Sequence, residues 1–221
     1  MAGNAGESVA WPPLRPGKPW LFWLNLGIKL TLIGLLMFAV ARQDLPQFHG
    51  KAMTGRALTY PLSMIIVPVA WWLMRGARSS AYPFALDILL VLPFLIDTGG
   101  NALNLNDTIS WWDDFNHFLN WAILAAASGQ FLVRLPVGRL AAAGLMIGFG
   151  ATTAIVWEIA EYITFVRNSP ELATAYTDTL GDLGLVLTGS VLAAGVTWLA
   201  WPVFRPHSPP SPEPSLLSAR G

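Results

Sequence analysis

Six long apolar segments constrain the fold of this chain more than any other feature of its sequence. A bilayer core about 30 Å thick needs roughly 20 apolar residues in a helix. Apolar residues make up 54% of the chain and charged residues only 12%, about half the share found in soluble domains. The sequence therefore predicts an all-α, polytopic integral membrane protein with about six transmembrane helices, over residues 20–41, 58–74, 81–97, 115–133, 140–166 and 183–204.

Polar, proline-rich segments flank the predicted helices. We interpret residues 1–19 as a cytoplasmic lead and residues 205–221 as a disordered tail. Lys and Arg residues in short loops set the orientation of a membrane protein, because they stay in the cytoplasm. Seven of them fall on the side of the two termini, against three in the first outer loop, Arg42, Lys51 and Arg56. We therefore expect both termini to be cytoplasmic.

The composition excludes several kinds of site. The chain contains no cysteine, which excludes disulfides, iron–sulfur clusters and thiolate metal sites. Of its three histidines only His117 lies within a predicted helix, so the paired axial ligands of a membrane haem are missing. The net charge is zero and no basic stripe is present, so we expect no nucleic-acid partner.

Carboxylates gather near the outer ends of the last four predicted helices, where Arg167 is the only basic residue at the same depth. Acidic residues contribute little to membrane topology, so this concentration needs another explanation. We interpret Asp107 and Glu171 as solvated loop residues. The nine acidic residues of this region are Asp97, Asp107, Asp113, Asp114, Glu158, Glu161, Glu171, Asp178 and Asp182.

Helical spacing predicts that several of these groups face the protein interior. Gly150, Ala154, Glu158 and Glu161 are spaced by 4, 4 and 3 residues and share one helical face. The small residues of that face allow a neighbouring helix to approach closely, so we expect both glutamates to face protein.

The two neighbouring helices repeat this spacing. Asp113 lies four residues before His117, Asp114 lies three before it, and Asn120 lies three after it. Asp178 and Asp182 are likewise four apart. The alternative is that each aspartate only caps a helix or favours its dipole.

Several carboxylates in a region of low dielectric constant need protons or a cation. Oxygen ligands suit Mg²⁺, Ca²⁺ or Mn²⁺, and an added histidine suits Zn²⁺. In an enzyme, Glu158 or Glu161 would be the general base and His117 a ligand or acid, in metal-assisted hydrolysis or transfer on an envelope lipid. An ion or small-solute carrier and a structural or accessory subunit remain open. The candidate metal ligands are Asp113, Asp114, His117, Glu158, Glu161, Asp178 and Asp182.

A second pair of charges lies inside the helices near the cytoplasmic side. Lys29 lies nine residues into the first predicted helix and Asp87 about six residues into the third. A rise of 1.5 Å per residue puts them within about 5 Å in depth. We predict a buried ion pair between these two helices, with a proton relay as the alternative.

Three short motifs resemble the YjdF-like family of bacterial integral inner-membrane proteins, and more distantly VanZ-like proteins. They are DDFNHF at 113–118, WEIAEY at 157–162 and DTLGDL at 178–183, followed by Gly189. The resemblance covers about residues 80–204 and implies location in the inner membrane. Its matching site positions are Asp113, His117, Glu158, Glu161, Asp178 and Asp182. VanZ-like proteins are associated with glycopeptide resistance, which implies membrane lipid as the partner.

The first motif departs from the family pattern. Asp114 stands where the family usually carries a basic residue, and Asn116 replaces a small residue. The chain thereby loses a cation and gains a carboxylate, which favours a bound metal ion.

Overall fold

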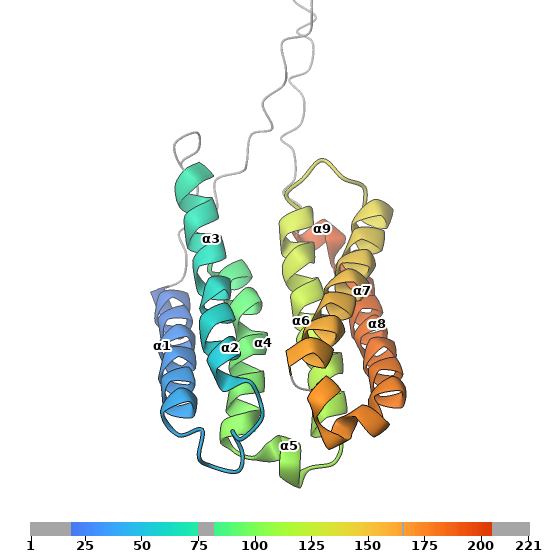
Figure 1. Ribbon diagram of the computed structural model, residues 1–221. Coiled ribbons are helices and arrows are strands. Elements are labelled where there is room, and N and C mark those ends of the chain that lie inside the picture. Colours follow the sequence, from blue (N-terminus) through green and yellow to red (C-terminus); the bar gives the residue numbers. More distant parts are fainter. Residues whose placement is uncertain (1–18, 75–81, 165, 205–221) are drawn as a thin grey trace, which may run out of the picture.

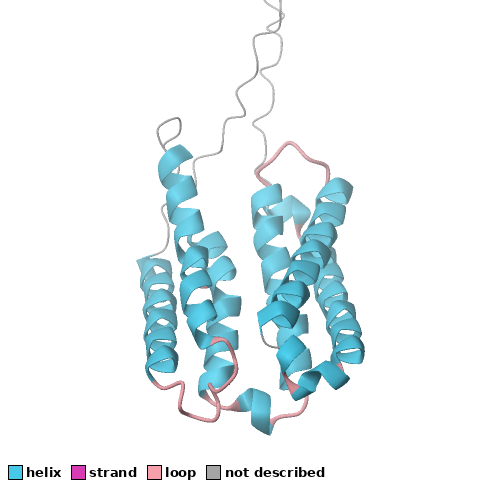
Figure 2. Ribbon diagram, in the orientation of Figure 1, coloured by secondary structure: helices cyan, strands magenta, loops and turns pink. Residues whose placement is uncertain are grey.

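The computed structural model describes residues 19–74, 82–164 and 166–204, and this part of the chain contains helices and no strand (Figure 2). Residues 1–18 of the predicted lead and the predicted tail, 205–221, lie outside it, and Pro19 begins the first helix. The helices are α1 (Pro19–Ala41), α2 (Met53–Thr59), α3 (Pro61–Met74), α4 (Phe84–Ala102), α5 (Leu105–Thr108), α6 (Trp112–Leu132), α7 (Arg139–Thr164), α8 (Ala175–Leu199) and α9 (Trp201–Phe204). Two short 3-10 turns, Val166–Asn168 and Pro170–Ala173, precede α8.

The long helices run up and down in two groups of three (Figure 1). The first group holds α1, the α2–α3 pair and α4, and the second holds α6, α7 and α8. Packing of α4 against α6 joins the groups, and α5 crosses between them at one end. We call this the lower end, as drawn in Figure 1; it also holds residues 42–52 and 166–174. Both the start of α1 and α9 lie at the upper end.

Among the described residues, five helical stretches are long and apolar enough to cross a membrane: Pro19–Ala41, Met53–Leu73, Phe84–Ala102, Arg139–Asn168 and Ala175–Leu199. Their outward faces expose large apolar side chains such as Trp23, Met37 and Leu73. The remaining long helix, α6, has the length of a span but carries more polar residues. It packs against α4, α7 and α8, so its polar residues Asn116, His117 and Asn120 are buried by protein.

The helices extend further into polar sequence than hydropathy predicts. The third predicted segment stops at residue 97, whereas α4 continues to Ala102. The last predicted segment starts at residue 183, whereas α8 starts at Ala175. Hydropathy locates the apolar part of a helix, whereas a helix can continue through polar residues, whose propensities differ from that of alanine by about 1 kcal/mol or less. The extension places Asp178 in the first turn of α8 and Asp182 beyond that turn.

The predicted Lys29–Asp87 ion pair is confirmed. Lys29 Nζ lies 2.6 Å from Oδ2 of Asp87, whose side chain is completely buried. The same oxygen accepts hydrogen bonds from Asn25 and Tyr82. These contacts tie α1 to α4 near the upper end of the first helix group.

Lys29 also donates to the backbone carbonyl of Met64, at 2.9 Å. In a regular helix this carbonyl accepts the N–H of the residue four positions later. That residue is Pro68, which lies inside α3 and has no N–H. Lys29 therefore supplies the donor that Pro68 removes, and it links α1, α3 and α4.

The predicted close approach of α7 to a neighbour is also observed. Gly150 and Ala154 are buried, and a methyl group on Gly150 would overlap the Ser190 hydroxyl of α8. On the other side of α8, a methyl group on Gly189 would overlap the Phe118 carbonyl oxygen of α6. Glycine at these two positions lets α8 pack tightly against both α6 and α7.

Candidate metal centre

His117 lies at the meeting point of α6, α7 and α8 near the lower end. Its side chain is 5% exposed, and its Nε2 atom lies 3.4 Å from Oε1 of Glu158. On the other side of the ring, Nδ1 lies 3.1 Å from Oδ1 of Asp182 and 3.7 Å from Oδ2 of Asp113. Three helices therefore bring together an imidazole and carboxylates that the sequence predicts to converge.

The structure divides the donor atoms into two groups around the imidazole ring. His117, Glu158 and Glu161 form one group, and Asp113, His117 and Asp182 form the other. Within each group the ligand atoms all lie within 4.8 Å of one another. Either group has the composition of a metal site, with nitrogen from histidine and oxygen from carboxylates.

The hydrogen-bond acceptors near Nδ1 of His117 determine which ring nitrogen carries the proton and which has a lone pair for a metal ion. The Nδ1 atom lies 3.2 Å from the Asp113 carbonyl oxygen, in addition to the nearby Asp182 carboxylate. Both neighbours are acceptors, so we assign the ring proton to Nδ1. The lone pair on Nε2 then points toward Glu158. Neither Nε2 nor Oε1 of Glu158 has a hydrogen-bond partner among the described residues, although both are buried.

The separation of these two atoms suits a shared metal ion. Zinc binds histidine nitrogen and carboxylate oxygen at about 2.0 to 2.1 Å, so two ligands of a tetrahedral site lie about 3.3 Å apart. The observed separation of Nε2 and Oε1 is 3.4 Å. Metal-binding histidines commonly donate their other N–H to a carboxylate, which is the position of Asp182.

Neighbouring side chains hold two members of this group in place. Thr179 of α8 donates to Oε2 of Glu158 at 3.0 Å. The His117 ring stacks on Trp121, with centroids 5.5 Å apart and planes inclined by 15°. The Glu161 carboxylate makes no hydrogen bond with a described residue, so it is the most adaptable member.

The remaining predicted ligands lie at the rim. Asp114 and Asp178 are exposed and belong to neither group. The N-cap residues of α6 and α8 are Trp111 and Thr174, and neither makes a side-chain cap. Helix dipoles account for carboxylates in the first turn of each helix. They do not account for Asp182, which is buried and lies beyond the first turn of α8.

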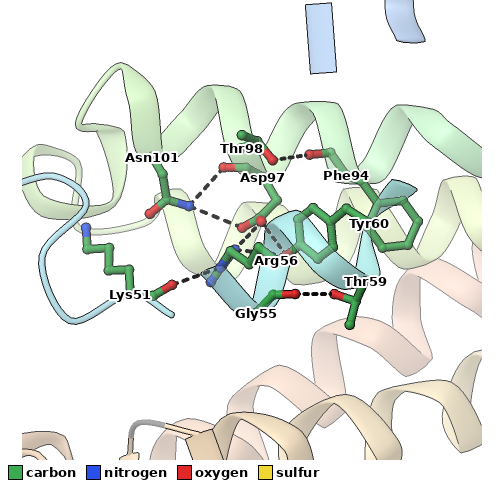
Figure 3. A network of polar contacts seen from close by, with 9 residues as sticks. All are labelled: Lys51, Gly55, Arg56, Thr59, Tyr60, Phe94, Asp97, Thr98 and Asn101. Carbon is green, nitrogen blue, oxygen red and sulfur yellow. Dashed lines mark hydrogen bonds and ion pairs between the residues drawn. The ribbon is translucent and has the colours of Figure 1, made fainter. Parts of the chain in front are cut away.

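A second polar network, which the sequence pattern does not predict, lies beside this group (Figure 3). Arg56 forms an ion pair with Asp97, and the Tyr60 hydroxyl donates to the same carboxylate at 2.6 Å. Arg56 also interacts electrostatically with Glu161. Asp97 is thereby neutralised and stands outside both metal groups. Once α2 is known to start at Met53, the spacing of four between Arg56 and Tyr60 places them on one face.

Aromatic rings link the two polar regions. The Tyr60 ring lies 6.3 Å from that of Trp157, which lies 5.9 Å from that of Trp121. Trp121 is buried and Trp157 packs against the apolar cores of both helix groups. These ring contacts connect the Arg56–Asp97 network with the His117 groups.

Asp107, interpreted from the sequence as a solvated loop residue, forms an ion pair with Lys51 at 2.7 Å. At the same end Arg42 pairs with Asp44, and Arg56 pairs with Asp97. No family model, curated protein or solved structure matches this chain, and the assignment of the site rests on its geometry.

Proposed function

We propose that this chain crosses the bacterial inner membrane six times and binds a divalent metal ion at its outer end through His117, Glu158 and Glu161. The main observation is that the buried Nε2 atom of His117 and Oε1 of Glu158 lie 3.4 Å apart, and that neither atom makes a hydrogen bond to another described residue. Five apolar helical stretches and the inward-facing α6 support six crossings. Both described chain ends lie at the upper end, which agrees with cytoplasmic termini.

We further propose that the metal centre acts on an envelope lipid by hydrolysis or group transfer. His117, Glu158 and Glu161 would supply three ligands and leave a position open, and a divalent metal held there would activate water or polarise an ester or phosphoryl oxygen. Asp182 and Thr179 orient His117 and Glu158, respectively. Glu161 lacks such a partner among the described residues, so it is the carboxylate best able to exchange coordination for proton transfer.

Elemental mass spectrometry on detergent-purified protein tests the metal site directly. We expect about one metal ion per chain in the wild type and its loss in His117→Ala and Glu158→Gln, with helical circular dichroism retained. Glu171→Gln is the matched control, because Glu171 is exposed on a turn at the same end. The readout is metal bound per chain.

Two results would contradict the proposal. The first is a wild type without metal after incubation with Zn²⁺, Mn²⁺, Mg²⁺ and Ca²⁺. A lower melting temperature of Glu158→Gln would then favour a structural role for the cluster. The second is ion flux in proteoliposomes that depends on Glu158, which would favour the carrier alternative.

Asp182 provides a graded test of the same site. Asp182→Ala removes the acceptor that holds the Nδ1 proton, so we expect metal affinity to fall by about 10- to 100-fold. Asp182→Asn retains an acceptor oxygen and should lose less. Competition with a fluorescent chelator measures both affinities. Equal losses in the two variants would show that the charge of Asp182, and not its orientation of His117, controls binding.

A further inference from the structure

The upper end of the second helix group carries two arginines, and the described part of this group has no carboxylate at that end. Arg134 lies in the loop between α6 and α7, and Arg139 is the first residue of α7. Every described carboxylate between residues 112 and 204 lies at the lower end of these helices. These carboxylates are Asp113, Asp114, Glu158, Glu161, Glu171, Asp178 and Asp182.

Arg134 is the more unusual of the two. Its Nη1 atom is buried and has no hydrogen-bond partner among the described residues. Its sequence neighbours Val133 and Leu135 belong to an apolar cluster that also contains Trp201. Burial lowers the pKa of the Arg134 guanidinium, yet arginine stays protonated in proteins. Arg134 is partly exposed, but a buried guanidinium nitrogen without a hydrogen-bond partner among the described residues is costly, so this geometry favours an anion beside it.

Arg139 places a second guanidinium at the same end. It is exposed, and its guanidinium carbon lies 4.6 Å above the centre of the Trp198 ring on α8. Tryptophan is typical of the boundary between lipid tails and water. Leu140 and Leu199, which are close to these two residues in sequence, expose large apolar side chains. The arginines therefore lie where charged lipid headgroups adjoin apolar helix surfaces.

We propose that Arg134 and Arg139 bind the phosphate group of an anionic phospholipid in the leaflet at the upper end. A guanidinium offers parallel N–H donors that match phosphate oxygens, and basic pockets between helices are known to bind lipid headgroups. The exposed apolar side chains of α7 and α8 would contact the acyl chains. The inference needs membrane insertion but not the metal centre, because Arg134 lies 17 residues beyond His117, roughly 25 Å along α6.

Lipid binding by native mass spectrometry tests this inference. Detergent-purified wild type, Arg134→Gln and Arg139→Gln are each titrated with phosphatidylglycerol and with zwitterionic phosphatidylcholine. We expect the wild type to prefer phosphatidylglycerol, and Arg134→Gln to bind it at least about tenfold more weakly, the effect of losing a charged hydrogen-bond partner. Arg42→Gln is the control, because Arg42 is exposed at the lower end and pairs with Asp44.

One further variant and two further measurements distinguish lipid binding from misfolding, from loss of the metal site and from binding of a soluble anion. Arg134→Lys keeps the charge without the planar donor pair and should bind with intermediate affinity, which covers the case in which Arg134→Gln does not fold. Metal content measured on the same samples should be unchanged, so a failed metal site and a failed lipid site are distinguishable. Equal binding of phosphatidylglycerol by wild type and Arg134→Gln would overturn the proposal. Displacement of the lipid by millimolar inorganic phosphate would instead identify a soluble anion as the ligand.

Discussion

Replacing Lys29 by methionine should destabilise the protein by about 3 to 5 kcal/mol, the usual cost of breaking a buried ion pair. The completely buried Asp87 would lose its cationic partner, although its bonds from Asn25 and Tyr82 would persist. Thermal or denaturant unfolding in detergent, followed by circular dichroism, measures the loss. Lys51→Met is the control, because its partner Asp107 is partly exposed and such pairs contribute at most about 1 kcal/mol.

A double-mutant cycle separates the two partners of Lys29. In a Pro68→Ala background, the new N–H of residue 68 can donate to the Met64 carbonyl, which otherwise depends on Lys29. The cost of Lys29→Met should therefore be smaller by about 1 kcal/mol in that background, the usual contribution of one hydrogen bond. An identical cost in both backgrounds would show that the Met64 contact contributes nothing.

The same network distinguishes an ion pair from a proton relay. Replacing both charges, in Lys29→Met with Asp87→Leu, removes the buried charges together and should recover most of the lost stability. A structural pair predicts that this double variant binds metal like the wild type. A relay predicts a stable protein in which proton-coupled transport in proteoliposomes is lost.

The depth at which each charged residue lies along its helix could be predicted from the sequence, because the rise per residue of an α-helix is fixed. That rise predicts the Lys29–Asp87 pair and the common level of His117, Glu158 and Asp182, and the structure confirms both. The Met64 contact could not be predicted in this way. It depends on which face of α1 points toward α3, and that rotation is set by packing between helices.

Helix ends in polar sequence were the weaker part of the prediction. The sequence predicts Arg56 in an outer loop because the apolar run begins after it, whereas α2 begins at Met53. Arg56, which the sequence pattern places among the basic residues of the outer loop, instead forms an ion pair with Asp97 beside the metal group. Hydropathy also could not divide the carboxylates into buried ligands and an exposed rim, because Asp178 and Asp182 differ only in their rotation about α8 and their distance from its start.

Gly189→Ala should impair stability and metal binding together. The added methyl group would meet the Phe118 carbonyl oxygen, which is backbone and cannot rotate away. Overpacking of this kind typically costs about 1 to 3 kcal/mol. Relief of the overlap requires α6 and α8 to separate next to His117, and Asp182 lies on α8 only two turns from Gly189. The 3.1 Å contact between Asp182 and His117 would lengthen, with a fall in metal affinity.

Gly195→Ala on the same helix provides the matched control, because nothing lies within 4 Å of its methyl position. Alanine favours a helix over glycine by about 0.5 to 1 kcal/mol, so this variant should be neutral or slightly more stable, with full metal content. Melting temperature and metal per chain, measured on both variants, complete the comparison. A Gly189→Ala protein with wild-type stability and metal content would show that α6 and α8 pack less closely than the structure indicates. Loss of metal with unchanged stability would instead show that the close contact of Gly189 with Phe118 is needed to position His117 but does not stabilise the fold. In that case α6 and α8 would have shifted without a change in the free energy of unfolding.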